Sequence, residues 1–422
     1  MVFQKLLLLI MALLGTPIFV IIAAFALLSF HSIGVDSSVI IIEMSRLAET
    51  PMLLSLPLFI FAGTLLSDSN APRRMLNISQ VLLGWMPGGL AVIALLICAL
   101  FTAFTGASGV TIFALGGILF PSLLKDNYPE NFSLGLVTTT GSLGLLFPPS
   151  LPLIIYGVIS ETRIDQLFLA GILPGILMLV LLAGYSIYKG RHVRNREFSF
   201  SGPDIKKALR EAAWEIPLPF IILGGIYGGI FVVGEAAAVT ALYVLIVEVF
   251  IYRDIKLGQL APIIVKSMIL FGGILVVLAA SMASTNYLID QEIPGQLFEL
   301  IRQYVHNKYA FLLMLNIFLL IVGTMLDIFS ALVLIVPLIV PIAQLYGVDL
   351  VHLGIIFLTN LQIGYCTPPV GINLFLASYR FNRPVTTLYS ASLPFLALLL
   401  ITLAIITYFP LLSLYLVKLW GS

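Results

Sequence analysis

Two pairs of adjacent prolines, Pro148-Pro149 and Pro368-Pro369, each interrupt an apolar run that is otherwise long enough to cross a membrane. Proline removes a backbone donor and pushes away the carbonyl four residues earlier, and it drives the residue before it out of helical geometry. The segments Gly144–Pro149 and Gly364–Pro369 are therefore predicted to be unwound. Unwound backbone at membrane depth is tolerated only where protein buries it or where it lines a wet cavity, so the chain should fold around these two interruptions.

The composition of the 422-residue chain is that of an integral membrane protein. It is 60% hydrophobic and 10% charged, whereas a soluble domain carries about a quarter charged residues. The apolar runs are continuous and do not alternate, which favours helices over a β-barrel. At ~20 residues per crossing the length allows roughly ten to twelve spans, the first of them over residues 6–28. We therefore predict an all-α polytopic membrane protein.

The same composition argues against several other classes. The net charge of +1 gives no indication of nucleic-acid binding. No nucleophile and base stand together as in a hydrolase, so we do not expect an enzyme. Cys98 and Cys366 sit in apolar sequence without metal-ligand spacing. Two buried thiols are favoured, and a single disulfide stays open as the alternative.

The chain also resembles itself at an offset of 220 positions. Five glycines or prolines coincide there: Pro121 with Pro341, Gly144 with Gly364, Pro148 with Pro368, Pro149 with Pro369 and Pro174 with Pro394. Such a shared register indicates two related halves. We expect an N-terminal scaffold span in 1–50, a first repeat in 51–188, a cytoplasmic linker with connecting scaffold helices in 189–270, and a second repeat in 271–422.

The distribution of charge predicts how the two repeats are oriented. The one long polar segment, residues 189–215, holds seven of the 21 Lys and Arg and is therefore placed inside the cell. Five crossings between residues 131 and 351 then invert the second repeat. Inverted repeats with interrupted helices are the architecture of secondary transporters. The basic residues that this topology leaves outside are only Arg46, Arg163, Arg302, Lys308 and Lys418.

Each repeat is predicted to hold a re-entrant helical hairpin beside its broken helix. In the first repeat the hairpin covers 88–124, with its tip at Thr105-Gly106-Ala107-Ser108-Gly109, and the broken helix covers 131–160. In the second repeat they cover 309–345, with Gly323-Thr324 at the tip, and 351–380. Freed carbonyls at such breaks bind a cation such as Na⁺, and half-helix N-termini attract an anion. A tip facing a break, twice, predicts two cation sites with a substrate site between them.

Several charged residues lie within apolar runs, where a carboxylate costs ~2.5 kcal/mol or more. Asp327, just beyond the second tip, is the strongest candidate, either as a cation ligand or as a support for the tip. A solvated helix-end carboxylate is the alternative. Glu235 and Glu248 are also embedded, and helix capping competes with function at Glu235. Arg163 and Arg380 follow the two broken helices and either pair with a substrate carboxylate or anchor at the membrane interface.

At these motifs the chain resembles the large membrane subunit of TRAP transporters, the tripartite ATP-independent periplasmic family. The stretch "GGIFVVGEAAAVTALY" at 228–243 is similar to the family's Gly-Phe-Thr-Pro-Thr-Glu-Ala segment, but it has Val and Gly where threonine and proline usually stand. The other carrying segments are "SLPLFIFAGTLL" at 55–66, "TGASG" at 105–109, "GSLGLLFPPSLPLIIYG" at 141–157, "LFLAGILPG" at 167–175, "GTMLDIFSALVLIVP" at 323–337 and "GVDLVHLGIIFLTNLQIGYCTPPVGINLF" at 347–375. Together they cover nearly the whole chain.

The resemblance implies a Na⁺-driven elevator importer in the bacterial inner membrane, in which a transport domain slides against a scaffold. It implies a small organic acid as cargo, such as a C4-dicarboxylate, a sialic acid or a keto acid. It also implies a soluble periplasmic binding protein and a small four-helix membrane subunit as partners. By position in the family's motifs, the first Na⁺ is expected around Gly106, Ser108, Gly144 and Phe147, and the second around Gly323, Asp327, Gly364 and Thr367. Substrate contacts are expected at Thr105, Ala107, Ser150, Thr324, Asn360 and Arg380.

Three other functions stay open at this point. A stand-alone divalent-anion/Na⁺ symporter of the same architecture would need no binding protein. A membrane subunit of a redox or proton-pumping complex would show buried Lys and Glu chains or paired histidines, neither of which is evident in the sequence. A passive channel would show no dependence on a Na⁺ gradient.

Overall fold

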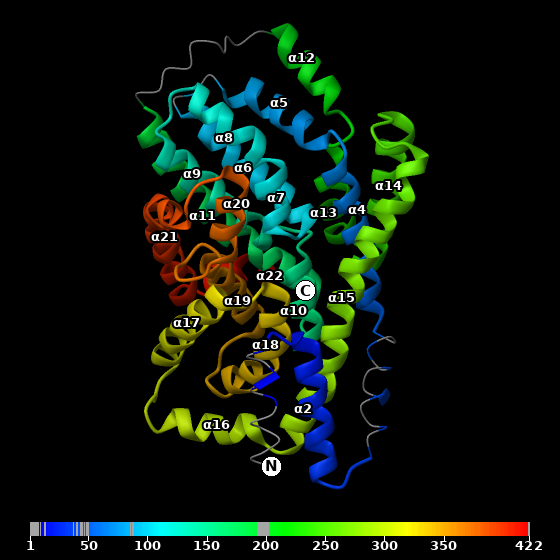
Figure 1. The fold of residues 1–422 in the computed structure, drawn as a ribbon, viewed down its shortest axis with the longest axis vertical. Coiled ribbons are helices and arrows are strands. Elements are labelled where there is room, and N and C mark those ends of the chain that lie inside the picture. Colours follow the sequence, from blue (N-terminus) through cyan, green and yellow to red (C-terminus); the bar gives the residue numbers. More distant parts are fainter. Residues whose placement is uncertain are drawn as a thin grey trace.

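The computed structural model describes residues 14–36, 50–84, 88–191 and 202–420, and the isolated residues 8, 10, 11, 38, 41, 42, 45, 47 and 86. Every regular element in these ranges is a helix (Figure 1), which confirms the all-α class. Much of the predicted span in 1–50, including Arg46, lies outside the described residues. So do residues 192–201 of the predicted cytoplasmic segment.

One side of the molecule is a column of helices that packs along α15 (Leu257–Asp290) (Figure 1). The helix α4 (Ser55–Asp68) packs against α14 (Val233–Leu245) and α15, and α2 (Ile18–Ser32) packs against the far half of α15. The column also contains η1 (Pro51–Leu54), α13 (Pro217–Tyr227) and the π-helical turn η3 (Ile246–Ile251) that continues α14. We refer to η1, α4, α13, α14, η3 and α15 as the helix column.

The first half of the chain continues from the column through one amphipathic helix into a hairpin and a broken helix. The amphipathic helix is α5 (Ala71–Leu83), and its apolar face packs against the first arm of the hairpin, α6 (Gly89–Thr105). The remaining elements are α7 (Ser108–Ala114), α8 (Gly116–Lys125), α9 (Glu130–Thr140), η2 (Leu143–Leu146), α10 (Leu151–Ser160), α11 (Ile164–Gly190) and α12 (Gly202–Glu211).

The second half repeats this order. The helix α16 (Ile293–Arg302) leads to the hairpin arms α17 (Lys308–Met325) and α18 (Ile328–Leu345), then to α19 (Leu350–Gly364), α20 (Ile372–Phe381), α21 (Val385–Tyr408) and α22 (Leu411–Trp420). Three of these helices begin with a side-chain cap, in which an Asn or Asp oxygen accepts from the free amides of the first turn. The capping residues are Asn307 for α17, Asp327 for α18 and Asp349 for α19.

Helix boundaries in the two halves coincide at the offset of 220 positions. The turn before α9 contains Asn127 with φ 62°, and its counterpart before α19 is Gly347 with φ 68°. The same offset relates the ends of α6 and α17 (Thr105 and Met325), the starts of α7 and α18 (Ser108 and Ile328) and the starts of α9 and α19 (Glu130 and Leu350). The register seen in the sequence therefore extends to the helices.

The hairpin arms of the two halves pack in the same pattern. Within each half, the first hairpin arm packs against its own broken helix: α6 against η2, and α17 against α19. Between the halves, the second arm packs against the other half's helix after the break: α7 against α20, and α18 against α10. Each hairpin thus contacts the broken helices of both halves. This arrangement places the candidate site between the halves.

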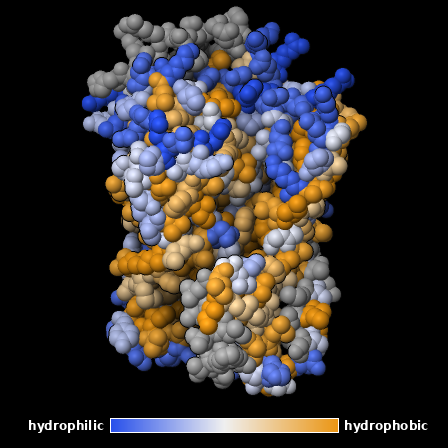
Figure 2. Space-filling view, in the orientation of Figure 1, coloured by the Kyte–Doolittle hydropathy of each residue, from blue (hydrophilic) through white to orange (hydrophobic). Residues whose placement is uncertain are grey.

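The described helices include several that can cross a membrane. By length and composition, six can do so alone, and eight if each of two bent pairs counts as one span. The bent pairs are α7 with α8 (48°) and α9–η2 with α10 (44°). This number is below the roughly ten to twelve expected from ~20 apolar residues per span, since α6 and α19 among others are too short to qualify. Figure 2 shows hydrophilic side chains gathered toward the two ends of the view and apolar ones between them.

Candidate functional site

The first double proline lies in a buried interruption between α9 and α10. After α9 the chain makes one 3₁₀ turn, η2, and is non-helical from Phe147 to Ser150. Every residue from Gly141 to Ser150 is buried except Phe147, which is half-buried. Gly144 lies within the 3₁₀ turn, so the fully non-helical backbone begins three residues later than predicted. The proline clash thus tightens the preceding turn and does not unwind it completely.

The second double proline lies in an interruption that is partly open. The helix α19 includes Gly364, one residue more than predicted, and α20 begins at Ile372. Between them, Thr367 and Pro368 are half-buried, and Pro369 and Val370 are exposed. Both double prolines have a cis peptide bond between the two rings.

The tip of the first hairpin lies against the first break. Gly106 adopts a φ of 66°, which favours glycine, and a Cβ there would lie 2.4 Å from a methyl carbon of Leu151, directly after the break. A Cβ on Gly144 would lie 2.1 Å from the carbonyl oxygen of Ala99 in α6. Glycine at both positions therefore allows hairpin and break to approach at backbone distance.

The tip of the second hairpin lies three residues beyond the predicted Gly323-Thr324. Both residues belong to the last turn of α17, and the chain turns at Leu326 and Asp327. Gly323 instead allows α17 and α19 to pack closely, since a Cβ on Gly364 would lie 2.5 Å from the carbonyl carbon of Gly323. Gly323 therefore indicates a close contact between two helix backbones and not the turn of the hairpin.

Two backbone donors fix this second tip to the second break. The amide of Gly371 donates to the carbonyl oxygen of Thr324 over 3.1 Å. The amide of Ile328 donates to the hydroxyl of Tyr365, which follows directly after α19. Each tip is therefore held against the break of its own half.

Asp327 supports the second tip as the N-cap of α18. Its Oδ2 accepts from the amides of Phe329 (3.0 Å) and Ser330 (3.1 Å). The side chain is half-buried at the turn, so it is not enclosed in an apolar span as the sequence suggested. Both caps use Oδ2, which leaves Oδ1 available to a ligand.

Polar contacts between the halves join the first tip and break to the second tip and break. The Ser108 hydroxyl, at the first tip, donates to Asn373 Oδ1 over 2.7 Å. Asn373 follows the second break on α20, is fully buried, and donates to the carbonyl oxygen of Thr138 over 3.5 Å. The Ser142 hydroxyl lies 3.3 Å from the carbonyl oxygen of Gln362, its own counterpart at the 220 offset. The breaks and tips therefore form one continuous polar region.

Sequence reasoning missed Asn373 and the contact of Cys366 with it (3.7 Å). An amide four residues after the proline pair Pro368-Pro369, within an apolar helix, is the signal that could have identified Asn373. Cys98 and Cys366 are both free and buried, which confirms the prediction of two buried thiols.

Most hydroxyls expected at the substrate bond to nearby backbone. The hydroxyls of Thr105 and Thr324 donate to carbonyl oxygens of their own helices, those of Phe101 (3.0 Å) and Ile321 (2.8 Å). The hydroxyl of Thr367, which was expected at the second Na⁺, donates back to Ile363 of α19 (2.8 Å). The Ser150 hydroxyl donates to Leu145 and caps α10. Ala107 is half-buried at the first tip. A hydroxyl that donates in this way keeps acceptor lone pairs, so these positions can offer a ligand both side-chain and backbone oxygens.

Three predicted residues are directed away from this region. Asn360 is fully buried and donates to Asn316 of α17 over 2.8 Å. Arg380 is exposed, and its guanidinium lies so close to α8 that a Cβ on Gly117 would be 1.9 Å from it. Arg163 forms an exposed ion pair with Asp165 at 2.7 Å.

Two embedded carboxylates also have structural partners. Glu235 accepts from the amide of Val232 over 3.0 Å, so it caps the start of α14. Glu248 pairs with Arg74 at 3.0 Å.

Within the described ranges, no group of three or more His, Cys, Asp or Glu side chains is placed to hold a metal ion. The breaks instead provide backbone carbonyls and the caps provide one carboxylate, which are the ligands of Na⁺ sites in transporters with interrupted helices. The eight residues predicted for Na⁺ fall into two groups, one at each tip and break.

Comparisons with known proteins agree over most of the chain. The family model described as "Tripartite ATP-independent periplasmic transporter, DctM component" matches residues 5–412. The C4-dicarboxylate TRAP transporter large permease protein DctM of Pseudomonas aeruginosa is 35% identical over 381 residues, 88% of each chain. The isethionate TRAP transporter permease protein DctMQ of Oleidesulfovibrio alaskensis is 36% identical over 85% of this chain, which spans 57% of that protein's length.

Further relatives have different substrates in their names. The ectoine TRAP transporter large permease protein TeaC of Halomonas elongata is 32% identical over 96% of each chain. All of these relatives are transport permeases and not enzymes. Among solved structures, the YdaH transporter of Alcanivorax borkumensis has a similar fold, with a TM-score of 0.60 at 14% identity over 90% of this chain and 88% of that one.

Proposed function

Because the chain belongs to the DctM family of tripartite ATP-independent periplasmic transporter components, we propose that it is the large membrane subunit of a Na⁺-coupled importer of a small organic acid anion. The observation that carries this proposal is the pairing of each hairpin tip with a double-proline break. Unwound backbone at membrane depth is tolerated where protein buries it or where it lines a wet cavity, and in secondary transporters such interrupted helices coordinate Na⁺.

The cargo site is proposed to lie between the two breaks. The helices α10 and α20 both begin directly after a break, at Leu151 and Ile372. Helix N-termini present free amides and partial positive charge, which attract a carboxylate. The relatives carry C4-dicarboxylate, isethionate and ectoine in their names, so the family tolerates several small charged cargoes. The exposed residues Pro369 and Val370 give access to this region from one side.

Two inverted repeats and an elevator movement are part of the same proposal. The register of helix boundaries and the exchange of hairpin packing between the halves support a pseudo-twofold relation. The concentration of basic residues in 189–215 supports the inversion. In this mechanism the hairpins and broken helices form the moving unit, and the helix column belongs to the scaffold.

The partners are proposed from the family. A periplasmic binding protein would deliver the cargo, and a small four-helix membrane subunit would extend the scaffold in the bacterial inner membrane. The Na⁺ ligands are proposed at Gly106, Ser108, Gly144 and Phe147, and at Gly323, Asp327, Gly364 and Thr367.

Uptake into vesicles tests the proposal. The cargo is found first, by melting shifts of the partner binding protein across a panel of organic acids. The chain and its small partner are then reconstituted, and uptake of that acid is measured with an inward Na⁺ or K⁺ gradient, with and without binding protein. We expect accumulation only with Na⁺ and binding protein together. Uptake that survives collapse of the Na⁺ gradient would contradict the coupling, and Na⁺-driven uptake without binding protein would instead support the stand-alone symporter.

A further inference from the structure

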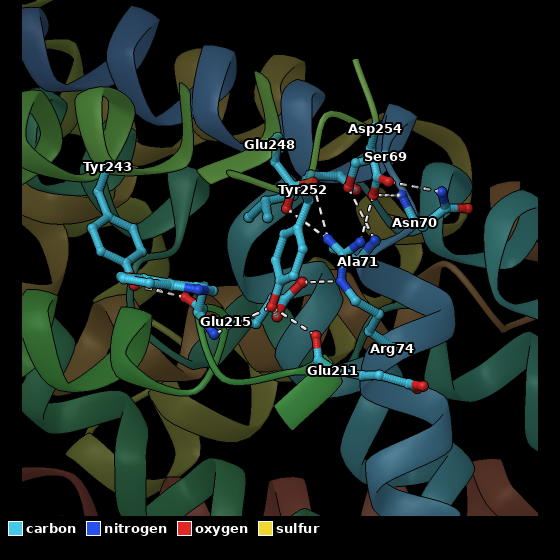
Figure 3. A network of polar contacts seen from close by, with 12 residues as sticks. Ser69, Asn70, Ala71, Arg74, Glu211, Glu215, Tyr243, Glu248, Tyr252 and Asp254 are labelled. Atoms are coloured by element: carbon cyan, nitrogen blue, oxygen red, sulfur yellow. Dashed lines mark hydrogen bonds and ion pairs between the residues drawn. The ribbon is translucent and has the colours of Figure 1, made fainter. Parts of the chain in front are cut away.

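A buried ion cluster around Arg74 joins α5 to the helix column (Figure 3). Arg74 lies in the first turn of α5, and each guanidinium nitrogen has a carboxylate partner. Nε donates to Glu215, Nη1 donates to Asp254, and Nη2 lies 3.0 Å from both oxygens of Glu248. The ring of Tyr252 lies 3.8 Å from the guanidinium carbon. All four partners come from one stretch of chain, residues 215–254.

This cluster is removed from water. The side chains of Glu248 and Glu215 are 0% and 2% exposed, and that of Arg74 is 11% exposed. Two buried carboxylates that lost their only shared cation would be left without a counter-charge, which folded proteins tolerate poorly. Lysine cannot replace the arginine, since an ammonium is a single point charge and cannot hold three carboxylates in a planar fork.

Further contacts fix the same corner of α5. Asp254 accepts from the amide and the side chain of Asn70, directly before α5, at 2.9 and 3.1 Å. Lys266 of α15 donates to Asp68, the last residue of α4, over 2.8 Å. The turn from α4 into α5 is therefore held to residues 254 and 266 just before Arg74.

The two ends of α5 have different neighbours. A cavity of about 250 Å³ lies between α5, α6 and residues 212–219, and Met75, Ile78 and Glu215 are among the residues that line it, so it reaches the cluster itself. At its other end α5 stops before Gly84, and α6 begins after Gly88, whose φ of 75° favours glycine. A Cβ on Gly88 would lie 2.9 Å from the Cα of Ile187, so this end packs against α11.

From these contacts we propose that Arg74 is the anchor that fixes the start of α5 to the helix column, so that this corner stays in place when the first hairpin moves. This inference rests on the elevator movement proposed above. It makes Arg74 a positioning residue, far from the breaks, which defines where the stationary part of the protein ends.

Pulsed-EPR distances between spin labels test the anchor directly. Labels on Asn77 in α5 and Leu270 in α15 report on the anchored joint, and labels on Leu124 in α8 and Leu270 report on the hairpin. All three side chains are exposed. The full chain is measured in lipid nanodiscs, in NaCl and in KCl. We expect one narrow distribution for the joint in both salts and a broad or two-component distribution for the hairpin.

Substitution at the cluster should change the joint. We expect Arg74→Gln to broaden the joint distribution about twofold, whereas the control Arg73→Gln, an exposed neighbour, should leave it unchanged. The pair Arg74→Gln with Glu248→Gln removes both charges and provides a second test should the single variant fail to fold. The proposed anchor would be wrong if the native joint distribution were as broad as the hairpin distribution. It would also be wrong if neither variant broadened the joint distribution. A hairpin pair that is narrow in both salts counts against the elevator alone, because the joint pair is read independently.

Discussion

The two double-proline breaks share a sequence motif and differ in their surroundings. The first, between α9 and α10, is enclosed: α6 approaches Gly144, and α11 approaches Leu146 so closely that a Cβ on Gly171 would lie 2.0 Å from its carbonyl oxygen. The second, between α19 and α20, is exposed at Pro369 and Val370. The motif therefore determines where a helix breaks, and the neighbouring helices determine whether the break is buried.

This difference bears on the proposed transport cycle. The first break is buried and the second is partly exposed, so the two can be compared directly. The predictions below test whether the two breaks differ in function, in packing and in access, from the largest expected effect to the smallest.

The largest effect is expected at the open break, from Asp327→Ala. Loss of a capping bond alone costs about 1 kcal/mol, but loss of a Na⁺ ligand should reduce Na⁺-driven uptake at least ~100-fold. Asp349→Ala is the matched control, since Asp349 caps α19 through two amides in the same way. Equal losses of uptake in the two variants would show that Asp327 acts only as a helix cap.

The second effect concerns packing at the enclosed break. Gly144→Ala would place a Cβ 2.1 Å from a backbone oxygen, whereas Gly323→Ala would place one 3.1 Å from its nearest neighbour. Overpacking of this kind costs about 1–3 kcal/mol, so Gly144→Ala should lower the Tm of the purified protein clearly more than Gly323→Ala. Gly184→Ala, with nothing within 4 Å of the new Cβ, should leave the Tm unchanged. A larger loss of Tm in Gly323→Ala than in Gly144→Ala would show that the first break has space for an added methyl group.

The third effect concerns access. We expect a water-soluble maleimide to label Val370→Cys at least ~10-fold faster than Leu145→Cys, because buried thiols react slowly and Leu145 is 1% exposed while Val370 is 38% exposed. The native Cys98 and Cys366 are buried, so unmodified protein provides the background. Labelling at equal rates would mean that the first break opens as readily as the second.

The smallest effect is expected where the two halves meet. Ser108→Ala removes the bond to Asn373, and a hydrogen bond of this kind contributes about 1 kcal/mol. We expect a loss of apparent Na⁺ affinity of about fivefold, measured as the Na⁺ dependence of uptake. Ser122→Ala is the control, since the Ser122 hydroxyl bonds within α8 to Ile118. No change in the Ser108 variant would argue that the first tip acts independently of the second half.

Proline chemistry made the interruptions predictable from the sequence. Its effect is local and does not depend on neighbours, and helices do end beside both proline pairs. Glycine was less informative, because its role depends on what lies opposite. Gly106 turns the first tip, while Gly323, expected at the second tip, packs against Gly364. Asp327 was the better marker of that turn, as a capping residue.

The Arg74 cluster could not be predicted from the sequence. Its carboxylates lie 141 to 180 positions from the arginine, and only the fold brings them together. Glu248 was noticed as an embedded charge, but nothing near it in the chain identifies its partner. The inverted orientation of the repeats, the domain boundaries and the Na⁺ ligands stay predictions, since they depend on the membrane and on ligands.

The contact of Ser142 with Gln362 carries an evolutionary consequence. These residues are 220 positions apart and correspond to each other, so each touches its own copy. If the chain arose by duplication of a shorter gene, that position once faced itself across the interface of a homodimer, as isologous contacts do. A residue there had to be compatible with an identical neighbour. Fusion of the two copies would have removed that requirement and allowed serine and glutamine to stand at the two positions.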